Sequence, residues 1–511
     1  MAAAPRQRRG DKALEAVTPT IDFQGRRIDA DAFFERYQRS AAALVALGVR
    51  PGDVVAMMMK NSPLLLELML ATRWIGALWC PINWHFKSEE VQYILSDSGA
   101  KVFVADAALL RGLDGLQLSG QQTFVAHDEA TDAGLPSWQA TRDATPPTSQ
   151  AAQPPRGAMF YTSGTTGRPK GIRRDAANPQ QAADSLAVLR HVLGFEPGMR
   201  ALVSAPMYHS APNSYSIGAA MEGGHLFIEE RFDAEGTLRL IEQHRISHAY
   251  LVPTMYVRLL QLPAEVKRRH DLSSMRFVAS TGSPCAADIK RAMVDWWGPV
   301  IHEAYGAGEL GYMTRLDSHE AMRKPGSAGR PLPGVTMKIL ADDGQPLPQG
   351  QAGLIYVHQP AFPEFTYVGN DAARARIERD GLKTLGDIGY LDEDGFLFIV
   401  DRAADLVISG GVNIYPAEIE AALQMMPGVA DCAVFGIPDA EFGEGLAAVV
   451  RPSAGAVLDA DQVKSYLRTR LADYKVPRLV KFQDDLPRED TGKIFKRKLR
   501  EPYWAGLARR I

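Results

Sequence analysis

The chain has 511 residues, which is too long for a single hydrophobic core, so two or more domains are expected. Its hydrophobic content of 46% and charged content of 23% are ordinary for a soluble globular protein. The net charge of −3, from 57 basic and 60 acidic residues, provides no general field for nucleic acid or anionic lipid, so we expect neither as a partner.

The N-terminal segment, MAAAPRQRRGDK, carries arginines but no apolar run, and therefore predicts a frayed tail and no signal peptide. The longest apolar stretch, Leu64–Ile82, includes Glu67 and Arg73, whereas a membrane span needs about 20 residues nearly free of charge. It predicts a core helix that runs into a strand, and no membrane span. The three cysteines are scattered and form no C-x-x-C pair, which argues against disulfides and a zinc site and fits a reducing cytoplasm.

Short β-rich runs alternate with helical patterns, and several end in Gly, Ser, Thr or Pro, as strands do in βαβ units. These runs lie at residues 53–59, 100–106, 201–206, 225–230, 248–254 and 275–281. We therefore predict an α/β fold with ligand loops at the strand ends, and see no internal repeat. Residues 141–157, rich in Pro, Ala and polar residues, predict a surface crossing and not a domain boundary.

The segment YTSGTTGRPKG, residues 161–171, follows an apolar approach at 158–160 that predicts the end of a strand. Backbone N–H groups of a Gly-rich turn form an anion nest, and Ser and Thr hydroxyls add donors, so the loop suits a polyphosphate. It is not the G-x-x-x-x-G-K-[ST] loop, because Lys170 comes three residues after Gly167 and Pro169 stands where a helix would begin. On composition alone, a phosphate loop and a surface loop of small residues are equally favoured.

The C-terminal quarter predicts a second, smaller domain. Residues 386–402 have the pattern of a hairpin that turns at Asp394-Gly395, and β-rich runs at 429–439, 445–453 and 479–487 follow, interleaved with helices. After Asp401 about 110 residues remain, enough for a small domain.

Further motifs follow the Gly-rich loop in order: YHS (208–210), YGAGE (305–309), GD (386–387), DRAAD (401–405), SGGVNIYPAEIE (409–420) and PREDTGKIFK (487–496). Together they resemble the signature of the adenylate-forming enzymes, which include acyl- and aryl-CoA synthetases, luciferases and adenylation domains of peptide synthetases. The resemblance spans residues 157 to 498. It implies a large, multi-layer N-terminal AMP-binding and acyl-binding domain (1–400) with α/β subdomains, and a small mobile α+β C-terminal domain (401–511) with its hinge near 401–405.

Family members activate a carboxylate with ATP to an acyl-adenylate, release pyrophosphate, and then let a thiol displace AMP. The resemblance thus implies ATP, Mg²⁺ and coenzyme A as cofactors. The loop residues that would wrap the β- and γ-phosphates are Thr162, Ser163, Gly164, Thr165, Thr166 and Gly167, with Lys170 as charge support. The implied metal ligands are Glu309 and Thr166. Gly308 stands where the family usually has Thr, and we expect it to leave wider space beside the α-phosphate.

The nucleotide would be held by further residues of these motifs. Asp387 is suited to accept hydrogen bonds from both ribose hydroxyls, and Arg402 would add donors near the ribose or phosphates. Tyr305 and Gly306 would flank adenine. Gly282 and Ser283, in TGSPCAADI (281–289), would line its opposite side.

Three residues are catalytic candidates by the same resemblance: Lys493, Glu309 and His209. Lys493 would place a cation between the attacking carboxylate and the α-phosphate, although a lysine in this basic tail would otherwise indicate a solvated face. For His209, proton transfer and a satisfied core histidine are equally favoured, and a pocket wall or gate is the better prediction. The expected acyl pocket comprises His209, Asn213, Ser214, Gly218, Ala304, Ala307 and Tyr312, and its many small residues suggest room for a bulky acid.

The C-terminal motifs carry the expected hinge and thiol path. Ala404 stands where family members with a swinging domain usually have Asp or Lys, which puts the hinge energetics in question. Gly410 and Gly411 would line the pantetheine tunnel, and Lys475 is a weaker candidate for the CoA phosphates.

The sequence therefore predicts an ATP-dependent ligase that joins a hydrophobic carboxylic acid, such as a fatty or steroid-side-chain acid, to coenzyme A. The alternatives are an aryl-acid–CoA ligase of the benzoate or cinnamate type and a stand-alone adenylation enzyme that loads a carrier protein. A nucleotide-binding protein without turnover is disfavoured, because Glu309, Asp387, Arg402 and Lys493 are all present. The acid and the oligomeric state stay open, with a homodimer as one alternative.

Overall fold

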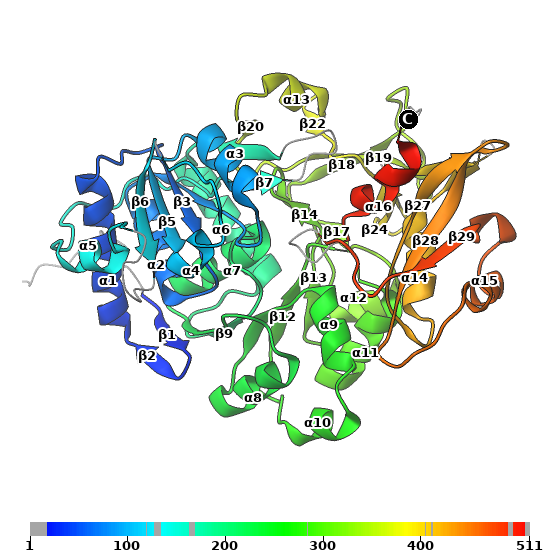
Figure 1. Cartoon of the computed structure of the whole chain (residues 1–511), viewed down its shortest axis with the longest axis horizontal. Coiled ribbons are helices and arrows are strands. Elements are labelled where there is room, and N and C mark those ends of the chain that lie inside the picture. Colours follow the sequence, from blue (N-terminus) through cyan, green and yellow to red (C-terminus); the bar gives the residue numbers. More distant parts are fainter. Residues whose placement is uncertain are drawn as a thin grey trace, which may run out of the picture. The chain divides into compact units, whose positions relative to one another are not determined.

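The computed structural model (Figure 1) describes residues 18–118, 120–126, 134–162, 169–283, 285–403, 405–409, 412–488 and 494–505. By compactness the chain divides into two units. Unit 1 comprises residues 1–160, 189–250 and 262–278, and unit 2 comprises residues 161–188, 251–261 and 279–511.

Unit 1 alternates strands and helices. Its first part contains β1 (Thr20–Phe23), β2 (Arg26–Ile28), α1 (Ala30–Ala46), β3 (Val54–Met58), α2 (Pro63–Trp74), β4 (Leu78–Pro81), α3 (Ser88–Ser98), β5 (Val102–Asp106), α4 (Ala107–Leu110), β6 (Gln122–Ala126) and α5 (Trp138–Asp143). Its later parts contain α6 (Pro179–Leu193), β9 (Arg200–Val203), α7 (Ser210–Met221), β10 (His225–Ile228), α8 (Ala234–His244), β11 (His248–Tyr250), α10 (Ala264–Arg269) and β12 (Phe277–Ser280). The chain crosses between the units several times, and two of these crossings fall inside elements, one within α6 and one within β12.

Two sheets of parallel strands organise unit 1. One has the order β4-β3-β5-β6, and every residue of its central strand β3 is buried, as expected for a strand covered on both faces. In the other, β11, β9, β10 and β1 lie side by side in parallel, and β2 adds an antiparallel edge. The strands predicted at 53–59, 100–106, 201–206, 225–230 and 248–254 are thus confirmed, although β11 ends before Pro253, where helix α9 begins.

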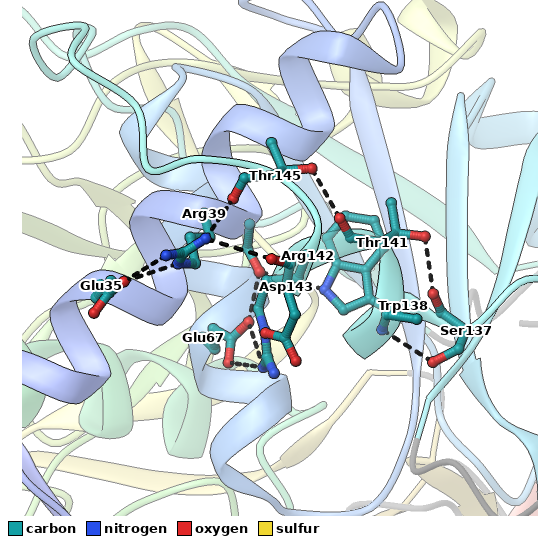
Figure 2. A network of polar contacts seen from close by, with 11 residues as sticks. Glu35, Arg39, Glu67, Ser137, Trp138, Thr141, Arg142, Asp143 and Thr145 are labelled. Carbon is teal, nitrogen blue, oxygen red and sulfur yellow. Dashed lines mark hydrogen bonds and ion pairs between the residues drawn. The ribbon is translucent and has the colours of Figure 1, made fainter.

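The apolar stretch Leu64–Ile82 forms helix α2 and strand β4, as predicted. Ser62 caps α2 by accepting a hydrogen bond from the backbone N–H of Leu65. The charge of Glu67 inside this helix is compensated: Arg142 of α5 donates to its Oε2 at 3.0 Å, and Ser40 of α1 donates to its Oε1. Figure 2 shows Arg142 pointing at Glu67 from the neighbouring helix.

Unit 2 begins with β7 (Tyr161–Thr162) and β8 (Lys170–Arg174) and takes α9 (Pro253–Leu260) from the middle of the chain. It continues with α11 (Ala287–Trp297), β13 (Ile301–Glu303), β14 (Gly306–Ala307), β15 (Gly311–Tyr312), β16 (Thr314–Arg315), α12 (Ser318–Arg323), β17 (Arg330–Pro331), β18 (Thr336–Leu340), β19 (Gly353–His358), β20 (Phe365–Tyr367), α13 (Asp371–Arg376), β21 (Glu378–Arg379), β22 (Leu382–Lys383), β23 (Asp387–Leu391) and β24 (Leu397–Arg402). The C-terminal elements are β25 (Val407–Ser409), β26 (Val412–Ile414), α14 (Pro416–Gln424), β27 (Val429–Asp439), β28 (Gly443–Pro452), α15 (Ala460–Arg468), the 3₁₀ helix η1 (Asp473–Lys475), β29 (Leu479–Phe482) and α16 (Lys496–Trp504).

The sheets of unit 2 are mostly antiparallel. A six-stranded sheet runs β21-β22-β19-β23-β24 with β18 beside β19, and the order β20-β8-β7 forms a separate three-stranded sheet. The hairpin predicted at 386–402 is confirmed as β23 and β24, with Gly395 in the turn at a positive φ of 76°. Such a backbone angle favours glycine.

The C-terminal strands form their own sheet, in the order β26-β25-β28-β27, with β29 parallel to β28. Helices α14 and α15 pack on it around a core that includes Val407, Ile419 and Val463. The predicted strands at 429–439, 445–453 and 479–487 are confirmed as β27, β28 and β29.

Residues 144–157 form neither helix nor strand, in agreement with the predicted surface crossing, while 141–143 belong to α5. The strand expected at 158–160 is reduced to a single bridge between Ala158 and Trp79. None of the helices in the described ranges is both long and apolar enough to span a lipid bilayer.

Candidate active site

The sheet β20-β8-β7 supports the centre of the candidate site. Thr162 of β7 pairs with Lys170, the first residue of β8, and Ile172 of β8 pairs with Tyr367 of β20. Lys170 thus begins a strand and not a helix, in agreement with the exclusion of a G-x-x-x-x-G-K-[ST] loop. Side chains alternate along a strand, so Lys170, Ile172 and Arg174 share one face of β8.

Glu309 lies between β14 and β15, with only 8% of its surface exposed. Its Oε1 accepts hydrogen bonds from the hydroxyl of Thr162 at 3.4 Å and from that of Tyr367 at 3.2 Å. The ammonium of Lys170 lies 5.0 Å from the centre of the Tyr367 ring. Burial and the nearby Glu309 charge raise the pKa of Tyr367, so its hydroxyl stays a donor at neutral pH. Thr162 therefore contacts the expected metal ligand through its side chain.

The Glu309 carboxylate fits a divalent cation. Within the described ranges no Lys, Arg or His forms an ion pair with it, and the nearby Arg174 charge, which acts on it only through space, is directed at backbone oxygens, so the buried carboxylate still gains from a bound cation. Those ranges also contain no group of three or more His, Cys, Asp or Glu side chains that could hold a metal alone. Mg²⁺ suits such a site, because it is commonly held by one or two carboxylates together with phosphate oxygens and water.

Arg174 is a residue of this site that the sequence reasoning missed. Its Nη2 donates to the backbone oxygens of Gly308 and Glu309 at 2.9 and 2.6 Å, and its Nη1 donates to that of Pro363 at 2.6 Å. Lost hydration lowers the pKa of Arg174 to about 10, although the charges of Glu309 and Glu364 oppose this, so the guanidinium is still charged at neutral pH. The alternation Lys170, Ile172, Arg174 was the signal that could have identified it. Tyr367 was missed as well, and no local motif marks it.

The space beside Gly308 is not open, contrary to our expectation. A Cβ at this position would lie 2.9 Å from Cδ1 of Ile172 and 3.9 Å from Cγ2 of Thr162. At Gly306 a Cβ would lie 2.8 Å from the backbone oxygen of Gly311. The tight β14–β15 pairing therefore requires glycine at 306 before any nucleotide is considered.

Asp387 begins β23 and is 7% exposed. Its Oδ2 accepts a hydrogen bond from the hydroxyl of Tyr305, and its Oδ1 accepts one from Nε of Arg402 at 3.2 Å. Burial and the Asp387 charge raise the pKa of Tyr305 well above its usual range. A carboxylate has about four acceptor positions, so Asp387 retains capacity for ribose hydroxyls. The structure thus brings together Tyr305, Asp387 and Arg402, three residues that the sequence predicts to contact the nucleotide.

Gly282 and Ser283 lie in the connection between β12 and α11, as the loop-to-helix prediction requires. Gly282 has a φ of 96°, a conformation that favours glycine.

Four acyl-pocket candidates lie in unit 1 at α7, and two of them prove to be core residues. Asn213 is 1% exposed, its Oδ1 accepts from Trp79 Nε1 at 3.1 Å, and its Nδ2 donates to the Met207 oxygen at 2.8 Å. A Cβ on Gly218 would lie 2.0 Å from the ring of Phe195. Asn213 is thus satisfied inside the protein and Phe195 fills the space beside Gly218, and their place in the acyl pocket stays a prediction.

The other two candidates of this region are half-buried at the start of α7. His209 is the N-cap residue, with its ring centre 4.3 Å from that of Tyr208. The Ser214 hydroxyl donates to the Ser210 oxygen one turn earlier.

In unit 2, Ala304 is buried and Ala307 pairs with Gly311 in the β14–β15 hairpin. Tyr312 is 7% exposed, and its hydroxyl has no hydrogen-bond partner in the described parts of the chain. A buried hydroxyl without a partner costs free energy, so it could donate to a bound ligand.

Lys475 binds both carboxylate oxygens of Glu418, at 2.8 and 2.6 Å. Its charge is thus neutralised, which weakens the prediction that it binds a CoA phosphate. The predicted residues that lie outside the described residues are Ser163, Gly164, Thr165, Thr166, Gly167, Ala404, Gly410, Gly411 and Lys493.

Comparison with known families gives two matches. Residues 3–363 match the AMP-binding enzyme family, and residues 418–493 match the AMP-binding enzyme C-terminal domain.

Named relatives include a feruloyl-CoA synthase of Amycolatopsis sp., 36% identical over 471 residues and 92% of each chain. The indoleacetate–CoA ligase of Aromatoleum aromaticum is 34% identical over 96% of each chain. The long-chain-fatty-acid–CoA ligase FadD13 of Mycobacterium tuberculosis is 33% identical over 91% of each chain.

Solved structures extend this similarity to the fold. ATP-bound MatB from Rhodopseudomonas palustris matches with a TM-score of 0.83 and 32% identity, over 96% of this chain and 97% of MatB. The amide bond synthetase McbA from Marinactinospora thermotolerans matches with a TM-score of 0.83 and 25% identity, over 95% and 97%. The predicted fold class, a large N-terminal α/β domain followed by a small C-terminal domain, is confirmed. The chain belongs to the AMP-binding enzyme family, whose two domains account for most of its length.

Proposed function

We propose that the protein is an AMP-forming acid–CoA ligase, which converts a carboxylic acid to an acyl-adenylate and transfers the acyl group to coenzyme A. The observation that carries the proposal is the buried Glu309 carboxylate, which has no ion-pair partner in the described ranges and adjoins Thr162 of the Gly-rich loop. Glu309 would hold Mg²⁺, whose charge would offset that of the ATP phosphates. Thr166 is a second proposed ligand.

The nucleotide contacts follow from the same arrangement. Residues 162–167 and Lys170 would bind the β- and γ-phosphates, where negative charge grows as pyrophosphate leaves. Asp387, oriented by Tyr305 and Arg402, would accept the ribose hydroxyls. Gly282 and Ser283 would lie beside adenine.

The C-terminal residues would separate the two half-reactions. Lys493 would stabilise the first transition state, and rotation about residues 401–405 would then bring Gly410 and Gly411 to the pantetheine arm. The proposed mobile domain would begin near Asp401. Lys475 would have to exchange Glu418 for a CoA phosphate.

We propose a hydrophobic acid as substrate. The named relatives act on ferulate, indoleacetate and long-chain fatty acids, which all combine a carboxylate with an apolar body. Two of these acids carry aromatic rings, so an aryl acid is a strong alternative to a role in fatty-acid metabolism. The three cysteines are free and buried, which supports a reducing, cytoplasmic location.

Measurement of pyrophosphate release and of acyl-CoA by mass spectrometry, over a panel of acids, tests the proposal. The panel pairs ferulate, indoleacetate and benzoate with palmitate and a steroid-side-chain acid, each with and without CoA. We expect a thioester and AMP for at least one hydrophobic acid. Adenylate formation without a thioester would instead favour an amine or carrier-protein acceptor, and no AMP with any acid would refute the proposal.

A further inference from the structure

We propose that Arg174 is a positioning residue for Mg·ATP, because it fixes the backbone on both sides of Glu309 and thereby the direction of the Glu309 carboxylate. The inference rests on the proposed function, in which Glu309 serves Mg·ATP. It concerns a residue that none of the recognised motifs includes.

The geometry of the guanidinium supports this role. Arg174 ends β8, opposite Phe365 of β20, and its Nη2 donates to two consecutive backbone oxygens, those of Gly308 and Glu309. These oxygens belong to the peptide planes before and after the Glu309 Cα. Nη2 carries two N–H groups whose directions are fixed by the planar guanidinium, so donation to both oxygens restricts both backbone angles of Glu309.

The same side chain anchors this turn to a neighbouring loop. Nη1 of Arg174 donates to the backbone oxygen of Pro363, which lies between β19 and β20, at 2.6 Å. Tyr367, two residues into β20 from Phe365, donates to the Glu309 carboxylate. The backbone and the carboxylate of Glu309 are therefore both tied to the segment 363–367.

The carboxylate is held asymmetrically. Thr162 and Tyr367 both donate to Oε1, and no described residue donates to Oε2. With the backbone fixed by Arg174 and one oxygen fixed by two hydroxyls, the other oxygen is presented in one direction. A ligand that is pre-oriented in this way binds a cation without the loss of conformational entropy that a free side chain would suffer.

The charge of Arg174 has a second effect. In the described chain its hydrogen bonds go to neutral backbone oxygens, while the ring centres of Phe362 and Phe365 each lie 5.9 Å from the guanidinium carbon. The positive charge is close enough to Glu309 to interact with it electrostatically. It therefore offsets part of the repulsion between Glu309 and a bound triphosphate.

Calorimetric titration of Mg·ATP and of AMP, in the absence of acid, tests the role in Arg174→Met. The matched control is Arg173→Met, because Arg173 is exposed and points to the opposite face of β8. We expect Arg174→Met to weaken Mg·ATP binding roughly tenfold or more, as for loss of hydrogen bonds to a charged group, with AMP affinity within about twofold. Arg173→Met should match the wild-type protein for both ligands.

A double variant separates positioning from general damage. Glu309→Gln alone should weaken Mg·ATP selectively, and adding Arg174→Met should change its affinity by less than about twofold, because both residues act through one carboxylate. Equal loss of AMP and Mg·ATP in Arg174→Met, or full additivity in the double variant, would overturn the inference. If Glu309→Gln weakens Mg·ATP and AMP binding equally, the metal role of Glu309 in the proposed function is refuted instead.

Arg174→Lys covers the case in which Arg174→Met does not fold. Lysine keeps the charge, but its single nitrogen cannot occupy the separate positions from which Nη2 binds the 308–309 oxygens and Nη1 binds the Pro363 oxygen. An intermediate loss of Mg·ATP affinity with unchanged AMP affinity supports the inference, and wild-type affinity for Mg·ATP overturns it.

Discussion

Removal of Arg142 should destabilise unit 1 by leaving the buried Glu67 charge without its ion-pair partner. Glu67 is 1% exposed, Arg142 Nη1 lies 3.0 Å from its Oε2, and the Ser40 hydroxyl is its other hydrogen-bond donor in the described structure. Breaking one partner of a buried ion pair costs about 3–5 kcal/mol. Arg142→Met should therefore lower the free energy of unfolding by about that amount at pH 8.

The pH dependence of this loss has a definite sign. Burial raises the pKa of Glu67 in the folded state, and Arg142 opposes that shift. In Arg142→Met the pKa should rise further, so the folded protein binds a proton more tightly than the unfolded chain. Stability then falls as pH rises from about 4.3, the unfolded value, to the folded pKa. Arg142→Met should accordingly lower the free energy of unfolding less at pH 5 than at pH 8.

Urea unfolding followed by tryptophan fluorescence measures both effects. Trp138 donates to the Ser40 hydroxyl at 3.3 Å and so reports on this network. Lys101→Met is the control, because it breaks an exposed ion pair with Asp53 and should cost less than about 1 kcal/mol. Glu67→Gln in the Arg142→Met background should recover much of the loss. A loss below about 1 kcal/mol at both pH values, or a greater loss at pH 5, would refute the reasoning.

Three further predictions concern the site and α7. Glu309→Gln should weaken Mg·ATP at least about tenfold in calorimetric titration but leave AMP nearly unchanged, and equal losses would mean that Glu309 only holds its loop. Lys493→Ala should slow adenylation roughly 10²–10³-fold yet spare thioester formation from a supplied acyl-adenylate. Gly410→Leu should instead slow thioester formation and spare adenylation. Rapid-quench assays measure both steps, and equal slowing of the two steps in Lys493→Ala would contradict domain alternation. Gly218→Ala should lower the melting temperature although alanine favours helices, because its Cβ would lie 2.0 Å from the Phe195 ring. Adding Phe195→Leu should recover part of the lost melting temperature. An unchanged melting temperature in Gly218→Ala would contradict this packing.

Local patterns were sufficient for the buried strand β3 and for the β23–β24 hairpin. The buried run Val54–Met58 and the Asp394-Gly395 turn are properties of a few consecutive residues, so their structure follows from the local sequence. The spacing likewise excluded a G-x-x-x-x-G-K-[ST] loop, because Lys170 comes three residues after Gly167, and Lys170 begins strand β8. Ordered motifs were likewise enough to assign the family and to associate Asp387 with Tyr305 and Arg402.

Tertiary structure alone decided what surrounds the small and polar residues of α7. Gly218 and Asn213 resemble pocket residues in the sequence, yet Phe195 and Trp79, which come from other segments, fill the space and satisfy the amide. Neither partner can be identified from the α7 sequence. Residue type records size and hydrogen-bonding capacity but not what occupies the neighbouring space.

The same limit applies to the Glu309 site. The sequence identified Glu309, because its motif is contiguous, whereas Arg174 lies 135 residues earlier in the chain and Tyr367 lies 58 residues later. Their roles arise only when β8 and β20 pair and bring both side chains to the 308–309 turn. The sequence by itself marked Glu309 as the candidate residue, and the pairing of distant strands decided which side chains contact it, because hydrogen bonds depend on positions in space and not on separation along the chain.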